Sequence, residues 1–329
     1  MKAIKILTMA ALATAVFASC SSEDELAQSN YPMDNVVRIM TSVDGMNTRA
    51  SYGNSTDKLN SFGFCINNAG NTKYTYDNIK VTKEGNNWNP ATQMLWQNST
   101  TAVDILAYAP YQETTEDATG KVKVFGKTDY AFSVKEDQSN AEDYSSDLIV
   151  YKQTGFTPGT NLNTNQAVNV AFTHLLSQLN LTIELRDQFN QDEKKPVTSA
   201  TVTDVKVDGT FIRSKVNFAA DPISFLRDGQ ASAAITPETV AFKKADKTTD
   251  HATFKYSAIV IPQRVYAGQL CIKFKVDGTD YIWTGSDDAL FESGKKYELH
   301  LLVGKDVVQG GAISAKPWGD ETITEKETD

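Results

Sequence analysis

Cysteine and histidine are scarce in this 329-residue chain, which contains three residues of each type. The cysteines lack the C-x-x-C spacing of zinc and redox sites, and they are too few for a disulfide framework. The G-x-S-x-G, H-E-x-x-H and P-loop patterns of common catalytic sites are also missing. We therefore expect no metal, no cofactor and no enzyme activity, and we expect Cys65 and Cys271 to be free thiols.

Basic residues are outnumbered, with 32 Lys and Arg against 41 Asp and Glu, so the formal net charge is −9. An acidic chain without a basic stripe is a poor ligand for nucleic acid, which we exclude as a partner. Long hydrophobic runs are missing as well. The apolar run at residues 6–17 is too short to span a bilayer, which takes about 20 apolar residues.

Residues 1–19 have the features of a secretory signal peptide. Two lysines precede the apolar run, whose length fits a signal h-region of roughly 7–15 residues. The small residues Ala18 and Ser19 stand immediately before Cys20. This order predicts cleavage of the bond between Ser19 and Cys20.

The same residues resemble the lipobox of bacterial lipoprotein precursors, although Phe17 stands where that family usually has Leu. The resemblance implies a lipid anchor on Cys20 in the outer membrane, and several acyl chains together hold a protein stably. The acidic run at residues 23–25 resembles the export tag of surface-exposed lipoproteins. The alternatives are an ordinary signal peptide with an incidental cysteine and a simple solvated tether.

The remaining sequence has the pattern of short strands separated by turns. In residues 179–185 every odd position is apolar and every even position is polar, as in a strand with one face in a core. Runs rich in Thr, Val, Ile, Tyr and Phe, broken by Asn, Asp and Gly, predict further strands. These are expected at residues 36–43, 62–67, 103–108, 122–125, 148–151, 168–172, 254–261 and 297–303.

Two Val-Asp-Gly-Thr sequences predict β-hairpins, because Asp-Gly supplies the positive φ angles of a type I′ turn. The first hairpin would pair Val205 with Ile212, and the second would pair Phe274 with Tyr281. His174 is in step with the apolar residues of its strand, so we expect it to point inward and to be hydrogen-bonded near a domain junction. The acidic pair at residues 287–288 is more typical of a solvated turn than of a glycosidase site.

Chain length predicts two domains, and a Gly-, Pro-, Asn- and Thr-rich stretch at residues 154–166 precedes the expected boundary. The prediction is an all-β protein of two antiparallel β-sandwich domains with few short helices. We assign residues 1–19 to the signal peptide, 20–35 to a flexible tether, 36–166 to the N-terminal domain and 167–329 to the C-terminal domain.

Several phrases, in order along nearly the whole chain, resemble the fimbrillin family of Gram-negative anaerobes, whose members are lipoprotein precursors of pilus subunits. They are Thr48-Arg49-Ala50, Trp96 and residues 103–110, 147–148, 170–179, 260–263, 291–297 and 315–318. The resemblance implies domains of transthyretin-like topology and a structural subunit of a fimbrium or a fimbrillin-like adhesin. It implies other fimbrial subunits as partners, and a host or bacterial surface ligand.

The resemblance also implies assembly by strand exchange after a trypsin-like protease cuts between Arg49 and Ala50. Upstream of that bond, Val37, Ile39, Thr41 and Val43 form an alternating strand. Its removal would expose an apolar groove with unpaired backbone groups, which is a template for strand addition. Alternatively, Arg49 is an exposed linker residue and the strand stays in place.

A C-terminal segment is the candidate donor strand, with Val307, Val308, Ala312 and Ile313 as its apolar residues. The other interpretation is an ordinary edge strand that closes the domain. As an alternative function we consider a glycan-binding surface lipoprotein. Tyr74, Tyr76 and Trp88 suit either a sugar site or packing on a strand face.

Overall fold

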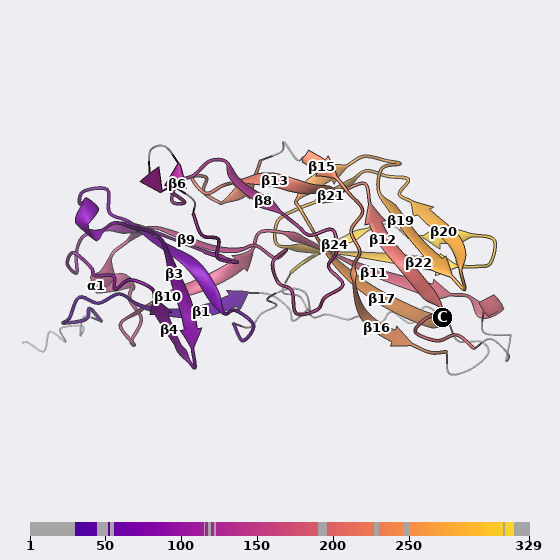
Figure 1. The fold of residues 1–329 in the computed structure, drawn as a ribbon, viewed down its shortest axis with the longest axis horizontal. Coiled ribbons are helices and arrows are strands. Elements are labelled where there is room, and N and C mark those ends of the chain that lie inside the picture. The colour runs from indigo at the N-terminus through magenta and orange to yellow at the C-terminus, as the bar shows by residue number, and fades with distance from the viewer. Residues whose placement is uncertain are drawn as a thin grey trace, which may run out of the picture.

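The computed structural model describes residues 30–44, 52, 56–114, 116–117, 120–121, 123–189, 196–226, 230–245, 251–311 and 313–318. Two β-rich lobes lie side by side along the long axis of the molecule (Figure 1). Helical segments are short in the described part of the chain: η1 (Thr72–Tyr74), α1 (Pro158–Asn161) and η2 (Asp187–Phe189). The predicted all-β class is therefore confirmed. No helix within these ranges is long and apolar enough to cross a membrane.

A seven-stranded sheet forms the N-terminal lobe, with the strand order β1-β10-β9-β5-β2-β3-β4. Its neighbours are antiparallel except for β1 and β10, which run parallel and lie far apart in the chain. A short hairpin β6–β7 lies beside it. The bounds are β1 (Arg38–Asp44), β2 (Ser61–Asn67), β3 (Tyr76–Glu84), β4 (Asn87–Pro90), β5 (Val103–Ala109), β6 (Glu116–Asp117), β7 (Gly120–Lys121), β9 (Ile149–Phe156) and β10 (Ala167–His174).

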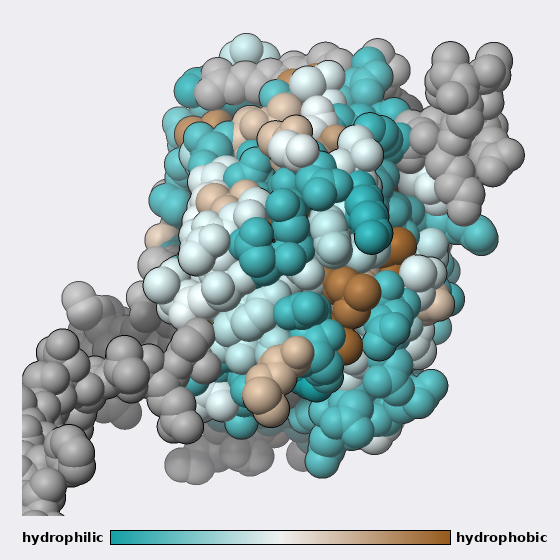
Figure 2. Space-filling model, turned by 90° about the vertical axis from the view of Figure 1, so that its left-hand side faces the viewer, coloured by the Kyte–Doolittle hydropathy of each residue, from teal (hydrophilic) through white to brown (hydrophobic). Residues whose placement is uncertain are grey.

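The core of this lobe is formed by the side chains that point inward at every second residue of its strands. In β10 every second residue from Val168 to His174 is buried, as the sequence pattern requires. The rings of Phe62 and Phe172 meet edge to face, with centroids 5.3 Å apart. Outside this core, the end of the lobe is mainly hydrophilic, with small scattered hydrophobic patches (Figure 2).

The C-terminal lobe contains a six-stranded sheet in the order β16-β17-β11-β22-β23, with β24 also on β22. Here β11 and β22 are parallel, and with β1 and β10 they are the two parallel strand pairs in the otherwise antiparallel sheets of the described residues. A parallel pair requires a long connection, which hairpin patterns in the sequence do not reveal. The bounds are β11 (Ser177–Leu185), β16 (Glu238–Lys243), β17 (Ala252–Val260), β22 (Lys295–Val303), β23 (Val308–Gly310) and β24 (Ser314–Pro317).

Smaller sheets cover this lobe. One has the order β12-β19-β20, a second joins β14, β13 and β15 with β8, and a third pairs β18 with β21. Their bounds are β8 (Tyr130–Ser133), β12 (Val202–Asp208), β13 (Phe211–Asn217), β14 (Ser224–Phe225), β15 (Gln230–Ser232), β18 (Gln263–Val265), β19 (Cys271–Val276), β20 (Thr279–Thr284) and β21 (Ala289–Phe291).

Of the two predicted hairpins, the second is confirmed. β19 and β20 pair in the expected register, with Phe274 opposite Tyr281. Their turn has φ angles of 49° at Asp277 and 83° at Gly278. The chemistry of an Asp-Gly turn and the side-chain pairing therefore agree at this site.

The first predicted hairpin is wrong. β12 pairs with β19, whereas β13 pairs with β8, β14 and β15, so Val205 and Ile212 belong to different sheets. Gly209 has a φ of 91° and makes a corner between those sheets. A Cβ atom there would collide with the backbone carbonyl of Gln269. The Asp-Gly pair thus specifies a sharp turn of the chain. The burial of apolar side chains on the following strand selects the strand with which it pairs.

A third expectation, a strand at residues 122–125, also fails in part. Val122 lies outside the described residues, and Val124 and Phe125 are not in a strand. Their backbone N–H groups donate instead to the carboxylate of Asp77, at 2.9 and 2.8 Å. The side chain replaces the neighbouring strand as acceptor.

The chain does not divide cleanly between the two lobes. β8 comes from the first half of the chain but pairs with β13 of the C-terminal lobe. Next to it, the amide of Gln138 accepts from the backbone of Ile259 at 2.7 Å and donates to it at 2.9 Å. Since β10 belongs to the N-terminal sheet, the expected division after residue 166 falls before the last strand of that sheet. After β8 the chain returns to the N-terminal sheet in β9 and β10, and it enters the C-terminal lobe for the last time between His174 and Ser177.

Candidate functional site

The N-terminal strand β1 is an integral part of the first sheet. Val37, Ile39 and Val43 are buried in the lobe core, and Thr41 on the same face is half-buried. β1 pairs with β10 so that Ile39 lies opposite Val168. Removing the strand would therefore open a cavity in the core and leave the edge of β10 unpaired.

On its other side, β1 faces β4 across a groove of about 660 Å³. At one end the groove is closed by the segment after β4, where Val37 N–H donates to the Met94 carbonyl at 3.0 Å. Backbone groups of a strand point to the same side at every second residue. Those of Ile39 and Thr41 thus face the groove, where no described residue pairs with them through its backbone.

The bond between Arg49 and Ala50 lies outside the described residues, as do Ser19, Cys20 and Ala312. The nearest described residue after that bond is Tyr52, whose side chain is buried. Its backbone N–H donates to Asp147 Oδ2 at 2.8 Å. Burial, followed by the charge of Asp147, raises the pKa of the Tyr52 phenol. The chain is therefore anchored on both sides of the candidate cleavage bond, by β1 and by Tyr52.

A buried junction cluster connects Tyr52 with the C-terminal segment. It consists of Tyr52, Asp147, His174 and Trp318, which are all buried. Asp147 Oδ1 lies 2.9 Å from His174 Nδ1, and since a carboxylate only accepts, this nitrogen carries the proton. The imidazole stacks on the Trp318 ring, with centroids 4.1 Å apart and planes 4° apart. The expectation that His174 points inward and is hydrogen-bonded is confirmed.

The candidate donor segment at the C-terminus lies along β22. β23 pairs with the C-terminal end of β22, and β24 pairs with its N-terminal end. Val307 is exposed, whereas Val308 and Ile313 are half-buried. The ring of Trp283 covers Gly310 so closely that any Cβ atom would collide with it. The segment lies at the edge of its own sheet. Both a donor strand and an ordinary closing strand would have this position.

Histidines outside the junction gather on one carboxylate. His300 Nε2 lies 2.6 Å from one oxygen of Glu184, and His251 Nδ1 contacts the other. His251 Nε2 in turn lies 2.8 Å from Asp187. Within the described ranges, no group of three or more His, Cys, Asp or Glu side chains has an arrangement that holds a metal ion. The sequence pattern gave no sign of this cluster.

The two cysteines of the described chain are free, as predicted. Cys65 is buried, and burial raises the pKa of its thiol.

Trp88 packs edge to face on Phe62, with ring centroids 5.1 Å apart, so packing on a strand face accounts for this aromatic residue. The hydroxyl of Tyr76 accepts the Leu95 N–H at 3.0 Å, so this side chain has a hydrogen-bond partner within the protein.

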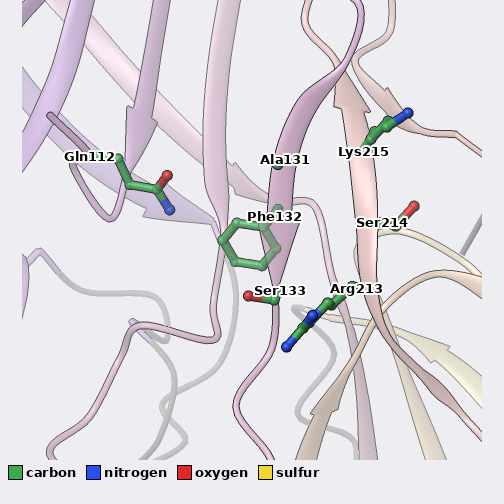
Figure 3. A pocket seen from close by; sticks show the side chains of 7 residues that line it. All are labelled: Gln112, Ala131, Phe132, Ser133, Arg213, Ser214 and Lys215. Carbon is green, nitrogen blue, oxygen red and sulfur yellow. The ribbon is translucent and has the colours of Figure 1, made fainter. Parts of the chain in front are cut away.

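A cleft of about 330 Å³ marks the place where the lobes meet, between β8, β13 and the loop after β5. Figure 3 shows Gln112 facing Phe132 across the cleft, while Arg213 extends toward Ser133 and Lys215 points away. Its lining consists of Gln112, Ala131, Phe132, Ser133, Arg213, Ser214 and Lys215. This set contains no carboxylate, imidazole or thiol for acid–base or nucleophilic chemistry.

The protein is a two-lobed β-protein with an edge strand near each end of the chain, β1 and β23. Its N-terminal strand, β1, completes the core of the first lobe. The fimbrillin-like family model matches residues 48–318, and the chain belongs to this family. The fimbrillin resemblance predicted from the sequence is confirmed. No curated protein has a sequence that matches the chain.

Similar solved structures support the same fold. A Bacteroides uniformis protein assigned to cell adhesion has 20% identity and a TM-score of 0.54, with 87% of this chain and 99% of that one covered. A Bacteroides ovatus protein, also assigned to cell adhesion, has 13% identity and a TM-score of 0.60, with 86% and 97% covered. At these identities, the likeness establishes the architecture alone.

Proposed function

We propose that this protein is a subunit of a fimbrium, or a fimbrillin-like surface adhesin, and that it acts as a structural protein and not as an enzyme. Membership of the fimbrillin-like family supports this role. The observation that carries it is β1: an edge strand that fills a core, is held by one neighbour, and precedes a basic residue at a candidate cleavage site.

Assembly would proceed by strand exchange. Cleavage between Arg49 and Ala50 would cut the covalent link between β1 and the rest of the chain. Tyr52 and the chain after it would stay in place, because the junction cluster holds Tyr52. The edge of β10 and the apolar side of the sheet would then accept a strand from the next subunit. Val307, Val308, Ala312 and Ile313 belong to the segment that would donate it.

Delivery would depend on the first twenty residues. Export as a lipoprotein with lipid on Cys20 would place the precursor in the outer membrane with its lobes at the cell surface. If the protease cuts after Arg49, the lipid leaves with β1. If it does not, the lipid anchors the subunit permanently, and the partners are other fimbrial subunits and a surface ligand.

Limited proteolysis tests this proposal. The purified precursor is treated with trypsin and compared with an Arg49→Gln variant, which keeps a long polar side chain but removes the cleavage site. We expect a cut between Arg49 and Ala50, established by mass spectrometry, followed by SDS-resistant ladders in the wild type alone. Intact monomer at every trypsin concentration, or ladders formed equally by Arg49→Gln, would contradict strand exchange at this bond.

A further inference from the structure

A second groove lies in the C-terminal lobe, and no residue of β1 or of the junction cluster lines it. Its volume is about 670 Å³, within the range of about 300–1,000 Å³ that small-ligand sites have. Strands β13, β14, β18 and β21 contribute its walls. Phe225, Ile261 and Phe291 are buried and form its base.

Exposed apolar side chains gather on the rim of this groove. Tyr266 is 58% exposed, Leu290 is 49% exposed and Phe211 is 39% exposed. Together they make up a third of the nine large hydrophobic side chains exposed on the described part of the chain. All three line the same groove, and apolar side chains that gather in one exposed place are typical of binding surfaces.

Hydrogen bonds hold the groove in shape without any ligand. The Gln263 side chain accepts the Phe211 N–H at 2.7 Å, and it donates to the carbonyl groups of Phe211 at 3.2 Å and Ile261 at 2.9 Å. Asp288 accepts the Ala267 N–H at 3.0 Å and so fixes the segment that carries Tyr266. A preorganised site of this kind loses little entropy when it binds.

The charges at the groove are already neutralised within the protein. Arg264 pairs with Asp288 at 3.2 Å, and Glu292 pairs with Lys295 at 2.9 Å. An acidic or basic ligand would therefore find no unpaired opposite charge here. The remaining donors and acceptors are those of the exposed pairs, together with Ser224, Ser293 and the Tyr266 hydroxyl.

We propose that this groove binds a neutral oligosaccharide. A pyranose ring has an apolar face of C–H groups and a rim of hydroxyls, and the groove offers flat apolar side chains next to neutral polar ones. Tyr266 would stack on the sugar face while Arg264 and the hydroxyl of Ser293 bond its hydroxyls. This assignment rests on the proposed adhesin function, because it names the chemical class of the surface ligand.

Calorimetric titration of the purified protein tests the assignment. The probes are maltohexaose, cellohexaose and lacto-N-neotetraose, with 3′-sialyllactose as the charged comparison. We expect saturable binding of at least one neutral sugar and a loss of roughly tenfold or more in affinity for Tyr266→Ala, the equivalent of about 1.4 kcal/mol. Ile282→Ala is the matched control, since Ile282 is exposed on β20 and does not line the groove.

The assignment is overturned by no saturable binding of any neutral probe, by equal affinity in wild type and Tyr266→Ala, or by binding of 3′-sialyllactose alone. Self-association that Tyr266→Ala abolishes would show that a second copy occupies the groove, which also overturns it. Thermal unfolding of both variants checks that they fold, and Phe211→Ala provides a second probe of the rim. Binding is measured on uncut monomer, so a protein that binds sugar without forming ladders refutes strand exchange alone.

Discussion

Asp147 is the residue through which the junction cluster can be tested most directly. It is fully buried and accepts from two donors, Tyr52 N–H at 2.8 Å and His174 Nδ1 at 2.9 Å. In Asp147→Ala both donors lose this acceptor. A buried donor left unsatisfied costs roughly 1–3 kcal/mol, so the variant should lose about 2–6 kcal/mol of unfolding free energy. Asp147→Asn keeps one carbonyl oxygen and should lose about half as much.

Urea denaturation followed by tryptophan fluorescence measures this loss, because Trp318 stacks on His174 inside the cluster. Asp129→Ala is the control: Asp129 is a largely exposed partner of Lys127 at 3.7 Å, and such pairs contribute under about 1 kcal/mol. Trypsin should also cut faster after Arg49 in Asp147→Ala, because Tyr52 is no longer held. An Asp147→Ala variant within about 1 kcal/mol of wild type would refute the assigned role of the cluster.

Three further outcomes are expected. Ile39→Ala should cost about 2–5 kcal/mol in urea unfolding, since it empties a buried position of β1. Gly310→Ala should force Trp283 away and weaken the C-terminal edge by about 1–3 kcal/mol, which faster hydrogen exchange at residues 308–310 would show. The hydrogen bond from Lys273 lowers the pKa of Asp208 in the folded state, so their pair stabilises the protein above the unfolded pKa of about 3.9. That contribution is small because the pair is partly exposed, and it is lost as the pH falls through the folded-state pKa.

Matched variants separate these effects from general damage. Ser42→Ala, at an exposed position of β1, should leave stability unchanged, and an equal loss in Ser42→Ala and Ile39→Ala would contradict the inward face. Gly311→Ala meets no neighbour and should preserve exchange rates at the edge. Asp208→Asn should differ from wild type at about pH 6 and match it at about pH 2. A difference that persists at the lower pH would exclude the ion pair as its cause.

Local patterns in the sequence were sufficient for several parts of the fold. The alternation in residues 179–185 appears as β11, and the Asp-Gly turn at Asp277 and Gly278 appears as the hairpin β19–β20. The inward faces of β1 and β10 were also correct. Each of these depends on residues that are close in the chain, where a period of two and the φ preference of a turn act directly.

Pairing between distant segments was decided only by the tertiary structure. The turn at Gly209 has the same chemistry as the turn at Gly278, yet it joins two sheets, because β12 pairs with β19 while β13 pairs with β8, β14 and β15. The parallel pairing of β1 with β10, the placement of β8 in the other lobe and the meeting of Tyr52 with Trp318 around Asp147 and His174 also depend on long-range packing. The packing of strand faces against one another depends on the whole core. The sequence of a single strand therefore does not determine which strand it pairs with. The sequence alone determined that the chain forms β-strands with a strand before Arg49; the tertiary structure decided that this strand lies at an edge of the sheet, with β10 as its neighbour.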